Sequence, residues 1–233
     1  MSIRRVLGVF LGRQFELIMS KHEQVFRDYY SRVTDPEFPK DVAASLAKEW
    51  GYHYWDGDRR INYGGYHYVE GYWTDFASKL IDVYNLTPKS RVLDVGCGKG
   101  FLLRELAQLL PGLKARGLDI SQYAIDNGDP AVKEALIGGN ASDLPFDDLT
   151  FDLAISVNTL HNLHVFELDS ALRELERVAT GKYLVVESYR TEKEKMNLLY
   201  WQVTCESFYT PEEWRWWFDR TGYSGDYEFI YFS

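Results

Sequence analysis

The sequence has little cysteine and lacks any pattern of metal ligands. Cys97 and Cys205 are its two cysteines, and neither stands in a CxxC motif or a Cys/His cluster. Such a chain offers neither a disulfide framework nor a zinc site. We therefore expect no bound metal and a location in the cytoplasm, where thiols stay reduced.

Long apolar runs are also missing. A membrane-spanning helix needs roughly 18 to 20 apolar residues, and no stretch approaches that length. The apolar run at residues 6–12 follows two arginines, as in a signal peptide, but it is short and ends at Arg13. We expect no membrane span, and residues 1–13 are either a surface or docking helix or extra residues upstream of Met19.

Positive charge is in deficit. The chain has 26 Lys and Arg against 35 Asp and Glu, a formal net charge of −9, and no basic run reverses that sign locally. An acidic surface repels polyphosphate, which disfavours a nucleic-acid partner. We expect a small-molecule partner instead, with a homodimer left open.

The chain changes character twice. Residues 20–50 have helical periodicity, whereas residues 51–71 are rich in aromatics and glycine and have neither helical nor strand period. Alternating strands and helices then follow, so we divide the chain at residues 1–70 and 71–233. Apolar strands separated by helices predict an α/β fold with a doubly wound, mostly parallel sheet. We expect strands at 91–95, 114–120, 135–137, 151–157, 182–188 and 226–232, and helices at 71–86, 101–110, 121–127, 166–179 and 211–221.

The strongest motif follows the first strand, which ends in Asp94. Gly96, Gly98 and Gly100 alternate before the next helix, and glycines there let the backbone approach a ligand and reach positive φ. The first strand-to-helix turn of a doubly wound sheet is a ligand site. A dinucleotide fingerprint would place its third glycine at position 101, which is Phe101 here, so a dinucleotide oxidoreductase is a poorer reading.

Two further elements come at the ends of later strands. Asp119 ends the second strand, where a carboxylate suits both hydroxyls of a ribose. Residues 139–146 follow the third strand, and there Asp143 could accept from an adenine amino group while a neighbouring backbone N–H donates to the ring. A solvated acid at Asp119 and a turn residue or helix cap at Asp143 are the alternative readings.

Taken together, these motifs resemble the class I S-adenosylmethionine (SAM)-dependent methyltransferases, in their small-molecule branch, over about residues 88 to 233. The resemblance implies a Rossmann-like sheet with SAM as methyl donor, S-adenosylhomocysteine as product and no metal. That family usually closes its sheet with an antiparallel hairpin, but the sequence after Gly222 suffices for one strand, so we expect six strands. The implied cofactor contacts are Asp94, Gly96, Gly98 and Gly100 for the methionine part, Asp119 with Ile120 for the ribose side, Asp143 and Leu144 for adenine, and Asn158 beneath the sulfonium.

Two residues near the same sheet edge are candidates for catalysis. His161 follows the fourth strand and, with an ordinary pKa near 6.5, could remove a proton from the acceptor. Glu187 ends the fifth strand and could bind a polar acceptor or an ammonium group. The alternatives are that His161 caps the next helix and that Glu187 pairs with Arg190 or Arg215.

The aromatic stretch before the cofactor motif is the candidate acceptor lid. Arg59 and Arg60 suit a carboxylate or phosphate, and Tyr63 and Tyr66 offer hydroxyls. These tyrosines could equally cover the sheet edge.

These observations predict an enzyme that methylates an O or N atom of a small polar metabolite, which could be anionic and carry a sugar or phosphate. An RNA or protein methyltransferase stays open, although the acidic balance disfavours it. A SAM-binding protein without transfer activity also stays open, because motifs indicate binding and not turnover.

Overall fold

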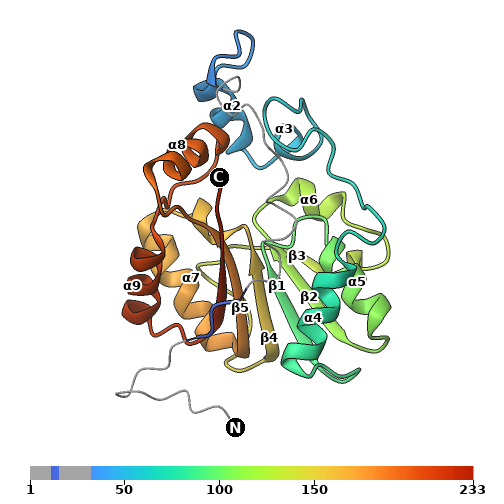
Figure 1. Ribbon diagram of the computed structural model, residues 1–233. Coiled ribbons are helices and arrows are strands. Elements are labelled where there is room, and N and C mark those ends of the chain that lie inside the picture. The colour runs from blue at the N-terminus through green and yellow to red at the C-terminus, as the bar shows by residue number, and fades with distance from the viewer. Residues whose placement is uncertain (1–11, 16–32, 233) are drawn as a thin grey trace.

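A computed structural model describes residues 12–15 and 33–232, and these form a layered α/β fold (Figure 1). Its sheet has six parallel strands in the order β3-β2-β1-β4-β5-β6. The predicted Rossmann-like, mostly parallel sheet is thus confirmed. The strands are β1 (Arg91–Val95), β2 (Lys114–Asp119), β3 (Leu136–Gly138), β4 (Phe151–Val157), β5 (Ala179–Glu187) and β6 (Asp226–Ile230).

Helices connect and cover these strands. Residues 1–11 of the predicted docking helix and the first part of the helical stretch at 20–50 lie outside the described residues, and residues 12 and 13 are not helical. In the described residues the α-helices are α2 (Lys40–Ala47), α3 (Tyr52–Trp55), α4 (Thr74–Tyr84), α5 (Phe101–Leu109), α6 (Gln122–Asp126), α7 (Val165–Val178), α8 (Glu192–Trp201) and α9 (Pro211–Thr221), with short 3₁₀ turns at η2 (Lys133–Ala135) and η3 (Leu160–Asn162).

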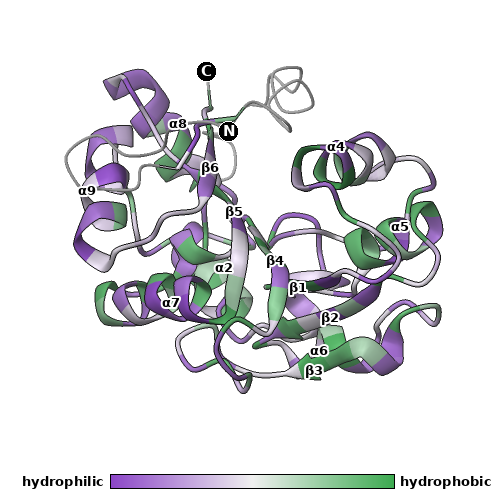
Figure 2. Ribbon diagram, turned by 90° about the horizontal axis from the view of Figure 1, so that it is seen from below, coloured by the Kyte–Doolittle hydropathy of each residue, from purple (hydrophilic) through white to green (hydrophobic). Residues whose placement is uncertain are grey.

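The pleat of the sheet divides the core into two apolar layers. Val92 points with Leu153 toward α4 and α5, whereas the adjacent Leu93 points toward α7 and α9. Figure 2 shows these helix pairs on opposite sides of the strands. Full burial of each such Leu or Val side chain contributes about 1.5–3 kcal/mol. Both faces of the sheet are therefore held, and its strand ends are left as a rigid platform.

The helix that precedes the last strand, α9, is capped at both ends. The Thr210 side chain accepts from the Glu213 N–H at 3.3 Å while Glu213 accepts from the Thr210 N–H at 2.7 Å, and Gly222 ends α9 at φ 75°. β6 then runs parallel to β5, with Tyr183 opposite Asp226. The expected single closing strand is present, and it lies directly beside β5.

Two helices lie where the sequence predicted none. α3 falls inside the stretch expected to be irregular, and α8 follows β5. α8 buries only Glu194 and Leu198 among its described residues, so it lacks the apolar stripe by which helices are recognised. Figure 1 shows α2, α3 and α8 above the carboxyl ends of the strands.

Candidate active site

The turn between β1 and α5 brings the backbone close to its surroundings. Gly96 has φ 82°, and a Cβ there would overlap the side chain of Thr159. Gly98 has φ 53°, and a Cβ there would lie 2.8 Å from the ring of Trp55. Both glycines line the cavity described below. Side chains at either position would occupy the space in front of the turn.

Gly100 has a different task. It precedes α5 at φ 81°, and its missing side chain faces Val132 and Leu136, whose methyl groups would lie 3.0 Å from a Cβ. It does not line the cavity. The structure places Gly100 where it serves the turn and the packing behind it, and the ligand contact expected there stays a prediction.

Two buried carboxyl groups stand at this turn. Asp119 accepts from the Gly98 N–H at 2.7 Å and from the Ser121 N–H at 2.8 Å, and burial raises its pKa despite these bonds. For Asp94, burial and the nearby charge of Asp119 raise the pKa to about 7. Both line the cavity. The pair concentrates negative charge where the backbone is most open to a ligand.

Asn158 follows β4 at the same edge. It adopts a left-handed φ of 56°, and its N–H donates to the Val185 carbonyl at 3.0 Å. Its Oδ1 is buried and has no hydrogen-bond partner in the described part of the chain. A buried acceptor without a donor costs free energy. Asn158 thus lines the cavity and carries a buried acceptor that no described residue satisfies.

The third strand end differs from the prediction. Asp143 is exposed, and the Leu144 N–H donates to Glu174 at 2.8 Å; neither residue lines the cavity. Asn140 and Ala141 do, and no described residue accepts from the Ala141 N–H. The wall at this point is thus formed three residues earlier than the sequence indicated, by an amide side chain and a free backbone donor.

One cavity of about 750 Å³ connects these features. It begins at the glycine turn and extends between the aromatic segment, residues 51–72, and the stretch that follows α8. Ile120, His161 and Glu187, which the sequence analysis named as candidate site residues, all line this cavity. Much of its wall is aromatic, and includes Tyr54, Trp55, Tyr63, Tyr66, Trp201 and Tyr231.

The two predicted acceptor-binding arginines separate in the structure. Arg59 lines the cavity, where it donates to the Asn62 carbonyl and lies 5.6 Å from the ring of Trp201. Arg60 points away from it and pairs with Asp58 and Glu37, both at 2.7 Å. In this structure Arg60 forms a surface ion pair, because nearby acids outside the cavity hold its guanidinium, and its predicted substrate contact stays a prediction.

His161 and Glu187 form a buried polar pair at the far wall. His161 Nδ1 accepts from the Glu187 N–H at 3.3 Å, which assigns the ring proton to Nε2, 3.5 Å from Glu187 Oε2. Burial lowers the pKa of His161 to about 3. Burial also raises the pKa of Glu187 to about 8, against the opposing bond from Gln202. Neutral His161 therefore has both ring nitrogens directed at Glu187.

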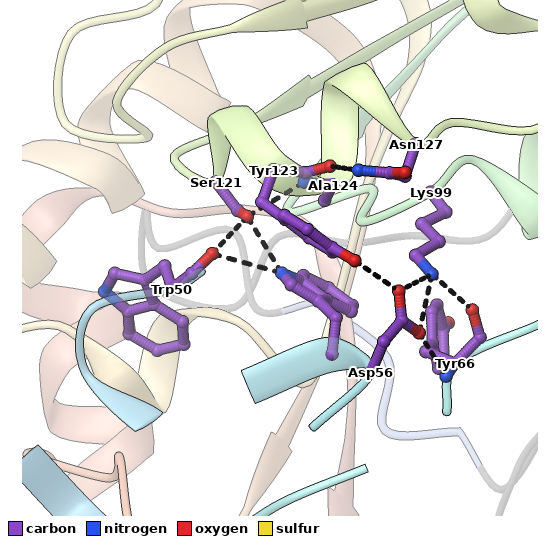
Figure 3. A network of polar contacts seen from close by, with 9 residues as sticks. Trp50, Asp56, Tyr66, Lys99, Ser121, Tyr123, Ala124 and Asn127 are labelled. Carbon is purple, nitrogen blue, oxygen red and sulfur yellow. Dashed lines mark hydrogen bonds and ion pairs between the residues drawn. The ribbon is translucent and has the colours of Figure 1, made fainter. Parts of the chain in front are cut away.

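A polar network ties the aromatic segment to the glycine turn (Figure 3). Lys99, inside the turn, donates to both oxygens of Asp56 at 2.8 and 2.7 Å and to the Tyr66 carbonyl at 2.8 Å. Asp56 also accepts from the Tyr123 hydroxyl at 2.9 Å. Burial opposes ionisation of Asp56, but these bonds lower its pKa. The aromatic segment is therefore held against the cofactor motif.

Several residues that line the cavity or hold its wall in place were missed from the sequence. Lys99 lies within the glycine motif, and a charged residue inside a ligand-binding turn is a signal that can be read. Trp201 and Gln202 could not be found this way, because they depend on where α8 lies over the sheet. Trp55 approaches Gly98 only through the fold of the aromatic segment.

The cavity wall is acidic. Five carboxyl groups line it, against one lysine and one arginine among the described residues, and Lys48 is paired with Glu206. In a partly enclosed space such charges act at lower dielectric than in water. The wall favours cationic or neutral ligands over anions. Its acids are Asp94, Asp119, Glu167, Glu187 and Glu206.

Two further findings bear on the described residues as a whole. They contain no cluster of three or more His, Cys, Asp or Glu side chains arranged to hold a metal ion. Their helices include none with the length and apolar character that crossing a bilayer requires.

The amino-acid sequence is similar to those of known proteins over part of its length. A demethylmenaquinone methyltransferase of Roseiflexus castenholzii is 39% identical over 92 residues, which are 38% of this chain and 38% of that protein. The 24-methylenesterol C-methyltransferase 2 of Arabidopsis thaliana is 30% identical over 124 residues, 49% of this chain and 34% of the relative. The chain thus spans well under two thirds of the length of these relatives.

A solved structure matches the fold. Geranyl diphosphate C-methyltransferase from Streptomyces coelicolor, in complex with Mg²⁺, geranyl diphosphate and S-adenosylhomocysteine, superimposes with a TM-score of 0.52 at 15% identity, over 63% of this chain and 58% of that one. A family model described as a methyltransferase domain matches residues 86–222, more than half of the chain. The chain therefore belongs to this methyltransferase-domain family.

Proposed function

We propose that the chain methylates a small molecule that has an aromatic or otherwise largely apolar body and no net negative charge. One observation carries this proposal: the cavity at the glycine turn and Asp119 continues, without division, into the aromatic wall. Ligand sites are typically apolar with a few convergent polar groups. A donor and an acceptor molecule would share this one space.

The residues at the glycine turn fit SAM. Asp119 suits the ribose hydroxyls, and the open backbone at Gly96 and Gly98 suits the methionine part. The unpartnered Asn158 Oδ1 and Ala141 N–H offer an acceptor and a donor for polar groups of the ligand. When bound, SAM supplies an electrophilic methyl carbon on a sulfonium, and the acidic wall favours that positive charge.

For adenine we propose Asn140 and Ala141 in place of Asp143 and Leu144. The Ala141 N–H is available to a ring nitrogen, whereas the Leu144 N–H is committed to Glu174. Asn140 Oδ1 already accepts from Ser142, which fixes this turn at the cavity edge.

The acceptor is the finer question. Methylation of an O or N atom of an anionic sugar or phosphate compound stays a prediction, and the charges of the wall argue against its anionic form. Arg60 is held outside, and Lys48 already has a partner. Arg59, which lines the cavity, donates to the Asn62 carbonyl and lies 5.6 Å from the ring of Trp201.

A carbon acceptor is the second candidate. The curated relatives carry names that give demethylmenaquinone and a sterol as acceptors, and both are apolar ring compounds. The aromatic wall suits such a molecule equally well. The position of the added methyl group, read by NMR of the product, separates carbon from nitrogen or oxygen transfer.

We further propose that His161 positions Glu187 and does not act as a general base. Its Nδ1 lone pair is engaged by the Glu187 N–H and its Nε2 proton faces the same residue. A base needs a free lone pair within reach of the proton that it removes.

An acceptor screen tests the proposed function. Purified protein with SAM is incubated with matched aromatic compounds that carry neutral, cationic or anionic heads, and release of S-adenosylhomocysteine is measured. We expect turnover with neutral or cationic compounds and none with their carboxylate or phosphate counterparts. Turnover confined to sugar phosphates or carboxylates would overturn the proposal.

A further inference from the structure

Glu187 presents one committed and one uncommitted carboxylate oxygen. Oε2 accepts from Gln202 and faces His161 Nε2 at 3.5 Å. Oε1 has no hydrogen bond to any described residue. Although the residue as a whole is only 4% exposed, Oε1 itself is not fully buried. Because Glu187 lines the cavity, Oε1 is reached from the cavity.

No Lys or Arg among the described residues forms an ion pair with the Glu187 carboxyl group. Arg190, one predicted partner, pairs instead with Glu194 at 2.5 Å. Lys48 is held by Glu206, and His161 is neutral. A buried carboxylate without a cation is unfavourable, and the raised pKa of Glu187 reflects that burial.

Aromatic rings line the same cavity as Glu187. Tyr63 is 39% exposed, lines the cavity and lies near enough for its pKa to be raised partly by the charge of Glu187, after burial as the larger cause. Trp201 and Tyr231 also line the cavity. Aromatic faces attract organic cations.

We propose that Glu187 is the recognition residue for the acceptor and binds a protonated amine through Oε1. This inference rests on the proposed function and adds the chemical class of the acceptor's polar group. A cationic donor satisfies the free oxygen and balances the charge together, whereas a hydroxyl satisfies only the first. An ammonium within hydrogen-bond reach also favours the ionised carboxylate.

Calorimetry with three matched probes tests this. 2-Phenylethylamine, 2-phenylethanol and 3-phenylpropanoate share a phenyl ring on a two-carbon chain and differ in the head group. Each is titrated into wild-type protein saturated with S-adenosylhomocysteine at pH 7.5. We expect the amine to bind about tenfold or more tighter than the alcohol, since charge-assisted hydrogen bonds are the stronger kind, and the carboxylate to bind weakest.

Glu187→Gln removes the charge and keeps the shape. We expect the amine's affinity to fall to that of the alcohol while S-adenosylhomocysteine affinity stays unchanged, which also verifies folding. Glu212→Gln, on the exposed start of α9, makes the same change of net charge away from the cavity and should keep the preference for the amine.

Several results would overturn the inference. These are equal or weaker binding of the amine relative to the alcohol in wild-type protein, no binding of the amine, or an unchanged preference in Glu187→Gln. If S-adenosylhomocysteine itself fails to bind wild-type protein, the proposed function fails first. The two failures are therefore distinguishable.

Discussion

At the scale of single residues, the site depends on two neighbouring buried carboxyl groups. Asp119 is held by two backbone N–H donors, whereas Asp94 has burial and a like charge against its ionisation. The two acids therefore differ in what they do before a ligand arrives. Asp119 is held in place by the backbone N–H groups of Gly98 and Ser121. The ionised form of Asp94 is disfavoured by burial and by the charge of Asp119.

Replacing Asp119 by Asn should weaken S-adenosylhomocysteine binding about 10- to 100-fold, because hydrogen bonds to a charged group contribute about 1.5–3 kcal/mol. Asn keeps one acceptor oxygen for the turn, so the fold should persist. Titration calorimetry measures the affinity. Asp143→Asn is the matched control and should bind as wild type; a loss there as large as in Asp119→Asn would restore the sequence-based assignment of Asp143.

The raised pKa of Asp94 predicts a pH-dependent stability difference. A carboxyl group whose folded pKa is raised from 3.8 to about 7 binds more protons when folded, so its contribution to stability falls as pH rises from about 4 to 7. Asp94→Asn removes that dependence. Without ligand, the variant should melt higher than wild type at pH 8, and by a smaller margin at pH 5. Equal margins at both pH values would contradict this.

Sequence reasoning found some of these residues and missed others for identifiable reasons. Asp94 and Asp119 end strands, and strand ends meet at one sheet edge, so their positions were predictable. At the third strand, the bond from the Ser142 N–H to Asn140 Oδ1 sets the turn and brings Asn140 and Ala141 to the wall. The sequence motif shows an acid at Asp143 but not which side of that turn faces the ligand.

At the scale of elements, the part of the cavity that we propose for the acceptor is made by segments without regular patterns. The aromatic segment is joined to the glycine turn by Lys99 and Asp56, and α8 crosses above the strand ends (Figure 1). A helix with few buried residues leaves no periodic signal. This explains why the sheet was predicted well and the acceptor wall was not.

A double-mutant cycle tests the join between the aromatic segment and the turn. Lys99→Met and Asp56→Asn should each lower the free energy of unfolding in urea, and the double variant should lose less than their sum by about 0.5–3 kcal/mol. The exposed Arg173–Asp169 pair on α7, at 2.8 Å, is the control and should couple by no more than about 0.5 kcal/mol. Additive losses for Lys99 and Asp56 would show that they act separately.

At the scale of the whole molecule, ligand binding is coupled to fold stability. The glycine turn, β4 and the aromatic segment all border the cavity, so a ligand that binds there stabilises parts distant in the sequence. S-Adenosylhomocysteine at 100 times its Kd should stabilise the fold by about 2.7 kcal/mol, which corresponds to a Tm increase of about 5–11 °C. Differential scanning fluorimetry measures this, with NADH as the control. An equal shift with NADH would argue against the cofactor assignment.

The outer edge of β6 has its own closure. Residues 13–15 run parallel to it, with the Phe15 N–H donating to the Tyr227 carbonyl at 2.8 Å and the Tyr227 N–H to the Arg13 carbonyl at 2.9 Å. Arg13 also pairs with buried Asp226 at 2.9 Å. An open strand edge recruits strands from other molecules and leads to aggregation. Here the chain covers that edge at Tyr227 with its own backbone, so its solubility at high concentration depends on residues remote from the catalytic cavity.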